Sequence, residues 1–244
     1  MSTVNAALSV VLVYPDLLGT YGDSGNALIL KKRAEFQGVK SEIISVASDE
    51  KLPKQGDIYL LGGGEDGPQN YARDLLGNDG GLQSAVSRGA VVFAVCAGFQ
   101  IIGNYYVDSK GESQLGLGLV EAKTTRLPKK RAVGELASKP LIPIGQEFLS
   151  GFENHGSGTE LSGDTLPLGQ VVSGVGNMEG GVYEGAVKGK VICTYMHGPA
   201  LARNPALADF LLHEATGLKP LGPHPIDDMQ RQLLAERLSK VVKS

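Results

Sequence analysis

The chain has 244 residues, of which 42% are hydrophobic and 20% charged, and its formal net charge is −3. This composition is typical of a globular domain in water, and the weak negative charge argues against the basic surface that nucleic-acid binding requires. Two cysteines and four histidines without ligand spacing predict neither a disulfide framework nor a bound metal.

The first hundred residues alternate short apolar runs with helical patterns. Four runs are expected to be strands: 8–13, which has the continuous apolar sequence of a strand buried on both faces, 42–46, 57–61 and 90–95. Helical periodicity separates them, over 27–38, 70–76, 81–89 and from Phe99 to Tyr106. This alternation predicts βαβ units and a parallel, doubly wound sheet.

The region 116–187 is rich in glycine and has short alternating runs but no clear amphipathic helix. Strands joined by hairpins are expected near 170–175, 180–187 and 190–196. We therefore predict an antiparallel extension of the sheet in this half.

Two helices are expected after this region. The first covers 204–217, with Asn204 as its N-cap and Gly217 past its end. The second covers about 226–242 and turns Leu234, Leu238 and Val241 inward. The whole chain, 1–244, is predicted to be one domain with its core over about 8–212.

Cys96 stands where the fourth expected strand ends. Ligands of α/β sheets bind beyond the carboxyl ends of the strands. A cysteine followed by Gly98 and a helix fits a nucleophile elbow, in which a sharp turn presents the side chain at this edge. The alternative interpretation is a small buried core residue.

His197 ends another apolar strand and precedes Gly198. Strand ends meet at one edge of a sheet, so Cys96 and His197 can lie in contact although they are far apart in the sequence. A thiol with an imidazole base is the minimum for covalent acyl transfer. The alternative is a histidine that caps a strand end. Cys193, inside the same strand, is expected to be a core residue.

Three glycines, 62–64, follow the third expected strand. Backbone without side chains can approach a substrate, and its N–H groups can stabilise an oxyanion. We predict donors from Gly63 or Gly64 and from Ala97, although the glycines alone fit a plain turn.

Three strands end, in chain order, in Gly-Gly-Gly, in Cys-x-Gly and in Thr-Tyr-x-His-Gly. This order resembles class I (triad-type) glutamine amidotransferases over roughly 8–212. "TYMHG" is similar to their cobyric-acid-synthase-like branch. Within it, "YPDLLGTYGDSGN" (14–26) and "GFENHGSGT" (151–159) resemble glutaminase subunits of lipid II isoglutaminyl synthases. The resemblance implies a flavodoxin-like α/β fold with a mostly parallel central sheet flanked by helices.

The same resemblance implies a function. Cys96 would attack L-glutamine to form a thioester, with His197 as base, and "KKRAVG" places Arg131 as the clamp for the substrate's α-carboxylate, with Arg126 as competitor. Ammonia would pass to a Mur-ligase-like partner of the MurT type in a heterodimer, which amidates D-glutamate of the lipid II stem peptide. The chain has no Gly-x-x-x-x-Gly-Lys-Ser/Thr loop, so no cofactor is expected here and ATP and magnesium are expected on the partner.

One feature departs from the family pattern. Typical members continue His-Pro-Glu, whereas this chain reads His197-Gly198-Pro199 and lacks an acid two residues after the histidine. The enzyme would then use a dyad, or a carboxylate from Asp23, Glu65, Glu179 or the partner subunit. We favour the partner, which predicts that the isolated chain is a poor glutaminase.

Two other functions stay open at this point. The chain could supply ammonia to a different acceptor, in a corrin or nucleotide pathway, or it could be a catalytically silent regulatory subunit. No apolar run approaches the roughly 18 residues of a membrane span, and no signal-peptide pattern is present, so a cytoplasmic location is expected.

Overall fold

The computed structural model describes residues 7–127, 131–219 and 224–241. Its central sheet has six strands in the order β13-β14-β4-β3-β1-β2, and all neighbours are parallel except β13 and β14. The strands are β1 (Leu8–Val13), β2 (Ser41–Val46), β3 (Ile58–Leu61), β4 (Val91–Val95), β13 (Ala186–Lys188) and β14 (Val191–Thr194). Every residue of β3, β4 and β14 is buried, as their continuous apolar sequences predict.

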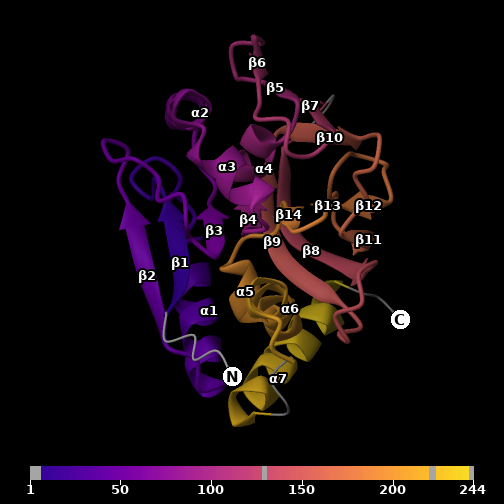
Figure 1. Ribbon diagram of the computed structural model, residues 1–244. Helices are drawn as coiled ribbons and strands as arrows, with labels where there is room; N and C mark the ends of the chain where they lie inside the picture. The colour runs from indigo at the N-terminus through magenta and orange to yellow at the C-terminus, as the bar shows by residue number, and fades with distance from the viewer. Residues whose placement is uncertain (1–6, 128–130, 220–223, 242–244) are drawn as a thin grey trace.

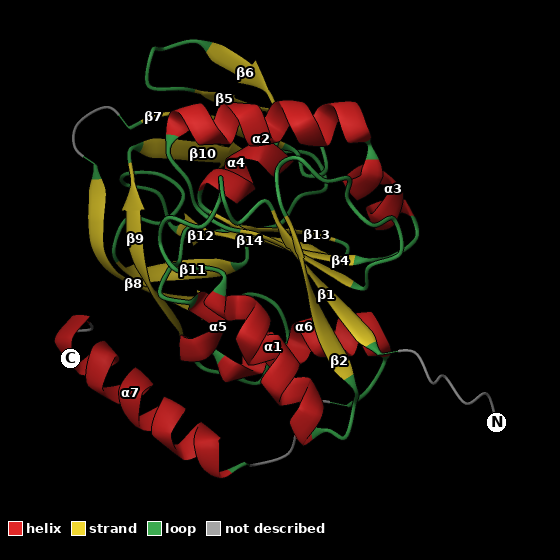
Figure 2. Ribbon diagram, turned by 90° about the vertical axis from the view of Figure 1, so that its left-hand side faces the viewer, coloured by secondary structure: helices red, strands yellow, loops and turns green. Residues whose placement is uncertain are grey.

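Helices cover both faces of this sheet, which confirms the doubly wound arrangement (Figures 1 and 2). One layer contains α2 (Asp66–Asp79), α3 (Gly81–Ser87) and α4 (Ala97–Ile102). The other contains α1 (Gly25–Phe36), α5 (Ala200–Arg203) and α6 (Pro205–Thr216), with α7 (Pro225–Val241) outside it.

The second half of the chain differs from the predicted extension. Only β13 adds an antiparallel strand to the central sheet; the rest form two further sheets, in the orders β10-β7-β5-β6 and β12-β11-β8-β9. The first contains β5 (Tyr105–Val107), β6 (Ser113–Leu115), β7 (Ala122–Arg126) and β10 (Ser157–Leu161). The second contains β8 (Ala132–Pro140), β9 (Leu149–His155), β11 (Gly169–Ser173) and β12 (Tyr183–Glu184). In β7 and β11 buried residues are interspersed with exposed ones, as is common where one face of a sheet is in solvent.

Two local expectations are corrected. Tyr106 does not continue the helix after Cys96, because α4 ends at Ile102 and Tyr106 lies in β5, where its hydroxyl donates to Asn70 Oδ1 at 2.6 Å. Asn204 is the N-cap residue of α6, as predicted, but its side chain makes no capping hydrogen bond. Instead Asn204 Oδ1 accepts the Ser150 N–H at 2.9 Å and its Nδ2 donates to the Ser150 carbonyl, which fastens β9 to the helices.

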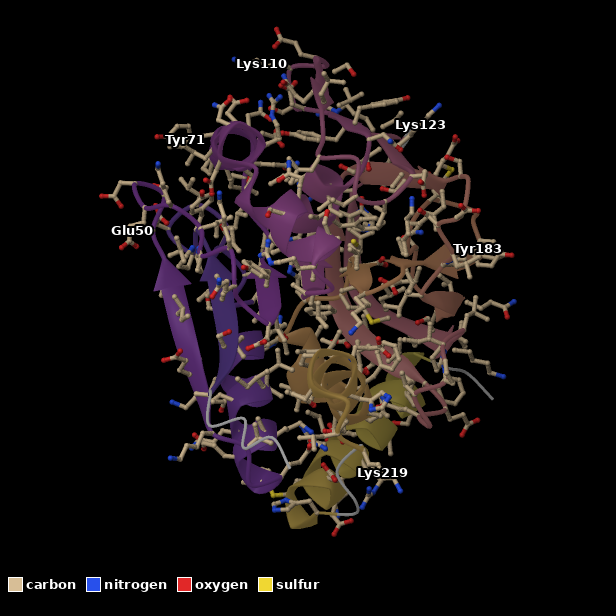
Figure 3. All side chains as sticks on the ribbon, in the orientation of Figure 1. Glu50, Tyr71, Lys110, Lys123, Tyr183 and Lys219 are labelled. Carbon is tan, nitrogen blue, oxygen red and sulfur yellow. The ribbon has the colours of Figure 1, made fainter. Side chains whose placement is uncertain are left out.

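The predicted C-terminal helix is present as α7, which packs against β8 and β9. Leu234 and Leu238 are half-buried, whereas the side chain of Val241 and all of residue 242 lie outside the described residues. Within the described ranges, no helix has the length and apolar character to cross a membrane. Charged side chains such as Glu50, Lys110, Lys123 and Lys219 project from the periphery (Figure 3).

Candidate active site

The carboxyl ends of three neighbouring strands bring the predicted site residues together. β4 lies between β3 and β14, with Leu61 paired to Ala94 and Thr194 paired to Val95. The chain leaves these strands at Gly62, Cys96 and Tyr195, so the glycines, the cysteine and His197 meet at one edge. A cavity opens there and is lined by Cys96, Ala97, Gly64 and residues of the loop after β1 and of β9.

Cys96 occupies a sharp turn between β4 and α4. Its φ of 53° and ψ of −105° lie in a region that L-residues rarely adopt, at a cost of about 1–3 kcal/mol. The turn is held because the Cys96 N–H donates to the Thr194 carbonyl at 2.9 Å. Gly98 is required beside it, since a Cβ there would lie 2.8 Å from the Leu61 carbonyl oxygen. This geometry is the elbow that the sequence predicts.

His197 is held by a carboxylate of this same chain. Its Nδ1 lies 2.9 Å from Asp23 Oδ2, and both side chains are almost fully buried. The backbone of His197 also pairs with Phe152 of β9, which fixes the residue after β14 has ended. Of the acids considered from the sequence, Asp23 is therefore the one that orients the imidazole, and the structure gives no reason to require a carboxylate from a partner.

The other imidazole nitrogen faces the cysteine side. His197 Nε2 is buried and has no hydrogen-bond partner among the described residues. Burial lowers the pKa of His197, but the hydrogen bond to Asp23 and the interaction with Cys96 outweigh burial and raise this pKa to about 10. The imidazolium is thus the favoured form near neutral pH.

The expected oxyanion donors are only partly in place. Gly64 and Ala97 line the cavity, and the Ala97 N–H, at the first position of α4, has no acceptor within its helix. Gly63 differs from the expectation because its N–H donates to Asp23 Oδ2 at 2.9 Å. Its lack of a side chain serves packing, since a Cβ at Gly63 would lie 2.7 Å from His197 Cε1.

Arg131 also lines the cavity. Its Nε donates to Asn154 Oδ1 at 2.6 Å, and its Nη2 approaches the Tyr21 hydroxyl at 3.4 Å. Arg126 also lines the cavity, but its Nη1 donates to the Ser109 carbonyl. Arg131 is thus the arginine joined to the histidine side of the cavity, because the Tyr21 ring packs 4.6 Å from the imidazole ring.

Sequence reasoning did not assign roles to Tyr21 or Asn154. Both lie in the two segments, 14–26 and 151–159, on which the family resemblance depended. The signal was therefore present in the segments, but nothing in their residue types showed which members face the cavity.

Comparisons with known proteins identify the family of the chain. Residues 9–205 match the family described as the CobB/CobQ-like glutamine amidotransferase domain. The chain is 38% identical to lipid II isoglutaminyl synthase (glutamine-hydrolysing) subunit GatD of Streptococcus pneumoniae, over 96% of this chain and 91% of that one. It is 30% identical to the subunit of the same name from Staphylococcus aureus, over 97% and 98%.

Two more distant similarities complete the comparison. A probable cobyric acid synthase of Methanothermobacter thermautotrophicus is 32% identical over 72% of this chain but only 38% of its own length. A crystal structure of a glutamine amidotransferase superposes with a TM-score of 0.58 at 19% identity, over 87% of this chain and all of that one. The structural likeness concerns the fold alone.

Proposed function

The chain belongs to the CobB/CobQ-like glutamine amidotransferase family, and from this membership we propose that it is a glutaminase subunit that supplies ammonia for the amidation of lipid II. The observation that carries the proposal is the Asp23–His197 pair, beside a strained Cys96 at one cavity. A merely structural cysteine would not need the backbone strain, and a silent regulatory subunit would not need the buried pair.

The chemistry follows from these three side chains. The Cys96 thiolate attacks the δ-carbonyl carbon of glutamine, and the resulting tetrahedral intermediate collapses as His197 gives its proton to the amide nitrogen. Ammonia leaves and a γ-glutamyl thioester stays on Cys96. His197 then takes a proton from water, the hydroxide attacks the thioester carbon, and glutamate is released with the thiolate restored. The balance is glutamine and water to glutamate and ammonia.

The surrounding residues support each step. Asp23 keeps the proton of His197 on Nδ1, so that Nε2 serves the reaction. The N–H groups of Gly64 and Ala97 are the proposed oxyanion donors. The Arg131 guanidinium is proposed to bind the α-carboxylate of glutamine in its two-pronged fashion.

The acceptor is inferred from the relatives and from what the chain lacks. Both isoglutaminyl synthase subunits are matched over more than nine-tenths of their length, whereas the cobyric acid synthase extends far beyond the matched region. The sequence contains no phosphate-binding loop of the Gly-x-x-x-x-Gly-Lys-Ser/Thr kind. We therefore assign ATP, magnesium and the activation of D-glutamate to a Mur-ligase-like partner, which would form D-isoglutamine with the ammonia.

The proposal is tested by following nitrogen. The chain, a Mur-ligase-like partner from the same source, ATP and lipid II are incubated with glutamine labelled at the amide nitrogen, and the label in lipid II is measured by mass spectrometry. We expect label with the wild type and with Cys193→Ala, and none with Cys96→Ala. Added ammonium chloride should restore amidation by the Cys96→Ala complex.

Two other results would contradict different parts of the proposal. Release of labelled ammonia without label in lipid II would show that the acceptor is different. No release of ammonia with the partner present would contradict the glutaminase function and favour a silent subunit.

A further inference from the structure

An arginine packs against the turn that follows His197. Gly198 has a φ of 131°, in a region that glycine adopts far more readily than other residues. A Cβ at Gly198 would lie 2.9 Å from Arg203 Nε, so the Arg203 side chain lies directly on the backbone of this turn. Arg203 is the last residue of α5, outside the lining of the active-site cavity.

Glu135 of β8 holds this arginine in place. Arg203 Nη1 donates to Glu135 Oε2 at 2.6 Å, and Nη2 donates to Oε1 at 3.5 Å. The two side chains are only 13% and 22% exposed, so solvent screens this ion pair less than it screens a pair on the surface. The pair therefore fixes the guanidinium over Gly198.

Glu135 also shares a row of the second sheet with His197. Glu135 is paired with Phe152 in the register of β8 and β9. Phe152 in turn exchanges two backbone hydrogen bonds with His197, at 2.8 and 3.1 Å. The segment 197–203 is thus held by this row at both ends, through the backbone of His197 and through the Arg203 side chain.

The same segment is joined to the helix that follows Asp23. The Leu201 N–H donates to Asn26 Oδ1, in the first turn of α1, at 2.9 Å. Helix α5 contacts both α1 and β9 (Figure 1). A shift of segment 197–203 would therefore change how the imidazole of His197 meets the Asp23 carboxylate.

The residues directly after His197 cannot hold its imidazole themselves. Gly198 and Pro199 carry no polar side chain, so the position of the imidazole depends on how the backbone of the turn is held. Beside the backbone bonds to Phe152, the Arg203–Glu135 pair is the contact that restrains this turn.

We infer that Glu135, acting through Arg203, is a positioning residue that sets the orientation of His197 toward Asp23 and Cys96. This inference rests on the proposed glutaminase function. Neither Glu135 nor Arg203 lines the cavity, so their loss should slow the reaction without weakening the binding of glutamine.

Arg237 provides a matched control, because it binds the same carboxylate from another side. Its Nη1 donates to Glu135 Oε1 at 3.4 Å from α7. The three atoms nearest to a Cβ at Gly198 all belong to Arg203. Arg237→Met therefore removes an ion pair of Glu135 but leaves the turn after His197 held.

The test uses the full chain in two measurements. Steady-state kinetics of glutamine hydrolysis, with the partner present, give kcat and KM. NMR titration of the histidine-labelled chain without partner gives the pKa of His197, whose signal is identified by its loss in His197→Gln. The variants are Arg203→Met, Glu135→Gln, the double variant, Arg203→Lys and Arg237→Met, and urea unfolding confirms that each is folded under the assay conditions.

Arg203→Met and Glu135→Gln should each lower kcat on the order of tenfold with little change in KM, less than the roughly 10²-fold that a 1 Å misplacement can cost. The double variant should be no slower than Arg203→Met, since both changes act through one contact. Arg203→Lys keeps a donor for Glu135 and should recover part of the loss. The pKa of His197 should fall from about 10 toward 6.5 in Arg203→Met, because its imidazole meets Asp23 less well, and should not change in Arg237→Met.

Several results would overturn the inference. A loss of kcat in Arg237→Met as large as in Arg203→Met would show that Glu135 serves only the stability of the fold. A wild-type kcat in Arg203→Met, or losses that add in the double variant, would show that the pair does not position His197. Should Arg203→Met fail to fold, Glu135→Gln and Arg203→Lys give the same comparison.

Failure of the proposed function gives a different outcome. In that case the wild-type chain with its partner releases no ammonia from glutamine. The titration of His197 needs no activity, so an equal pKa of His197 in Arg203→Met and in the wild type would still overturn the positioning role.

Discussion

Helix α1 joins two buried charged clusters of opposite character. Asp23 lies just before the helix and contacts His197, whereas Arg33 lies near its far end and contacts Asp209 and Asp227. Arg33 lies eight positions after the first residue of the helix, Gly25, which corresponds to about 12 Å of helix.

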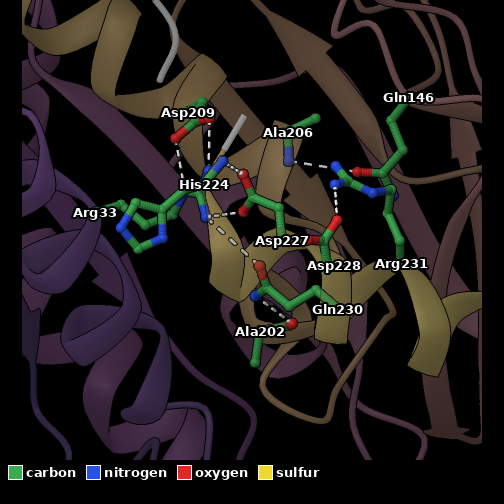
Figure 4. A network of polar contacts seen from close by, with 10 residues as sticks. All are labelled: Arg33, Gln146, Ala202, Ala206, Asp209, His224, Asp227, Asp228, Gln230 and Arg231. Atoms are coloured by element: carbon green, nitrogen blue, oxygen red, sulfur yellow. Dashed lines mark hydrogen bonds and ion pairs between the residues drawn. The ribbon is translucent and has the colours of Figure 1, made fainter. Parts of the chain in front are cut away.

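The cluster around Arg33 is fully paired (Figure 4). Arg33 Nε and Nη2 donate to the two oxygens of Asp209 at 2.6 and 2.7 Å, and Nη1 donates to Asp227 Oδ1 at 2.8 Å. Asp227 Oδ2 accepts the His224 N–H at 3.2 Å. This network ties α1, α6 and α7 together.

The cluster around Asp23 leaves polar atoms without partners. Asp23 Oδ1 and His197 Nε2 are both buried and unpaired among the described residues, and the neighbouring Cys96 is strained. Burying such atoms costs free energy without stabilising the fold. Paired buried charges therefore hold the helices together, whereas unpaired polar atoms beside a cavity mark a site of chemistry.

Asp23→Asn should have the largest effect of the substitutions considered. The amide keeps the shape of the side chain but loses the charge that orients His197, so kcat for glutamine hydrolysis should fall by on the order of 10² to 10⁴. The pKa of His197 should fall toward its ordinary value. Because that pKa is raised from 6.5 to about 10 in the fold, the stabilisation from this pair is complete below pH 6.5 and is lost as the pH rises through 10.

The matched control is Asp16→Asn in the same loop, whose side chain is exposed and accepts the Ser48 N–H. It should leave kcat unchanged. A wild-type kcat in Asp23→Asn would contradict the role of Asp23 as the third catalytic group and would favour a carboxylate from a partner subunit.

Arg33→Met tests the paired cluster at the other end of α1. It leaves Asp209 and Asp227 as buried charges without their partner, which should lower the free energy of unfolding by about 3–5 kcal/mol. Urea unfolding measures the loss, and kcat of the folded fraction should not change. Lys32→Met, at an exposed position on the same helix, should cost less than about 1 kcal/mol. A stability loss no larger than that of Lys32→Met would contradict the assignment of Arg33 to assembly.

Arg131→Ala tests which arginine of the cavity binds the α-carboxylate of glutamine. Loss of a two-pronged contact to the α-carboxylate should raise KM for glutamine by about 10- to 100-fold, with a smaller effect on kcat. Steady-state kinetics of Arg131→Ala and Arg126→Ala separate the two candidates. A larger KM for Arg126→Ala would move the clamp to that residue.

Glu184 offers an intermediate case, in which the expected effect is on stability alone. Its Oε1 accepts Thr194 Oγ1 and the Tyr195 N–H, its Oε2 is buried and unpaired, and it does not line the active-site cavity. Burial raises the pKa of Glu184 to about 7, so the folded state holds a proton that the unfolded state releases above pH 4.5.

Folding stability from this group therefore decreases as the pH rises from 4.5 through 7, at about 1.4 kcal/mol per unit of pKa shift. Glu184→Gln removes the titration, so the wild-type advantage over the variant should shrink between pH 5 and pH 8. Urea unfolding at both pH values measures it. A difference that is constant with pH would contradict the protonated state of Glu184.

Much of this arrangement follows from sequence. Continuous apolar runs identify the buried parallel strands, and the residues that end them, Cys96 and His197, are brought together because parallel strands share a carboxyl edge. The sheets of the glycine-rich second half are not predicted from the sequence, since short half-exposed strands do not show which sheet they join.

The contacts of Asp23 could not be read in advance. Asp23 and His197 are 174 residues apart, and their meeting depends on the path of an irregular loop. The same loop explains why Gly63, expected to be an oxyanion donor, gives its N–H to Asp23 instead. Polar loop residues have no periodicity, so their partners appear only in the folded chain.

Modification by a glutamine analogue tests directly whether Cys96 is the nucleophile served by the Asp23–His197 pair. The full chain, alone and with its partner, is incubated with the glutamine analogue 6-diazo-5-oxo-L-norleucine, and the modified peptide is identified by mass spectrometry. We predict one covalent adduct, on Cys96, that is absent from Cys96→Ala and suppressed by L-glutamine. An adduct on Cys193, or none under either condition, would contradict the account.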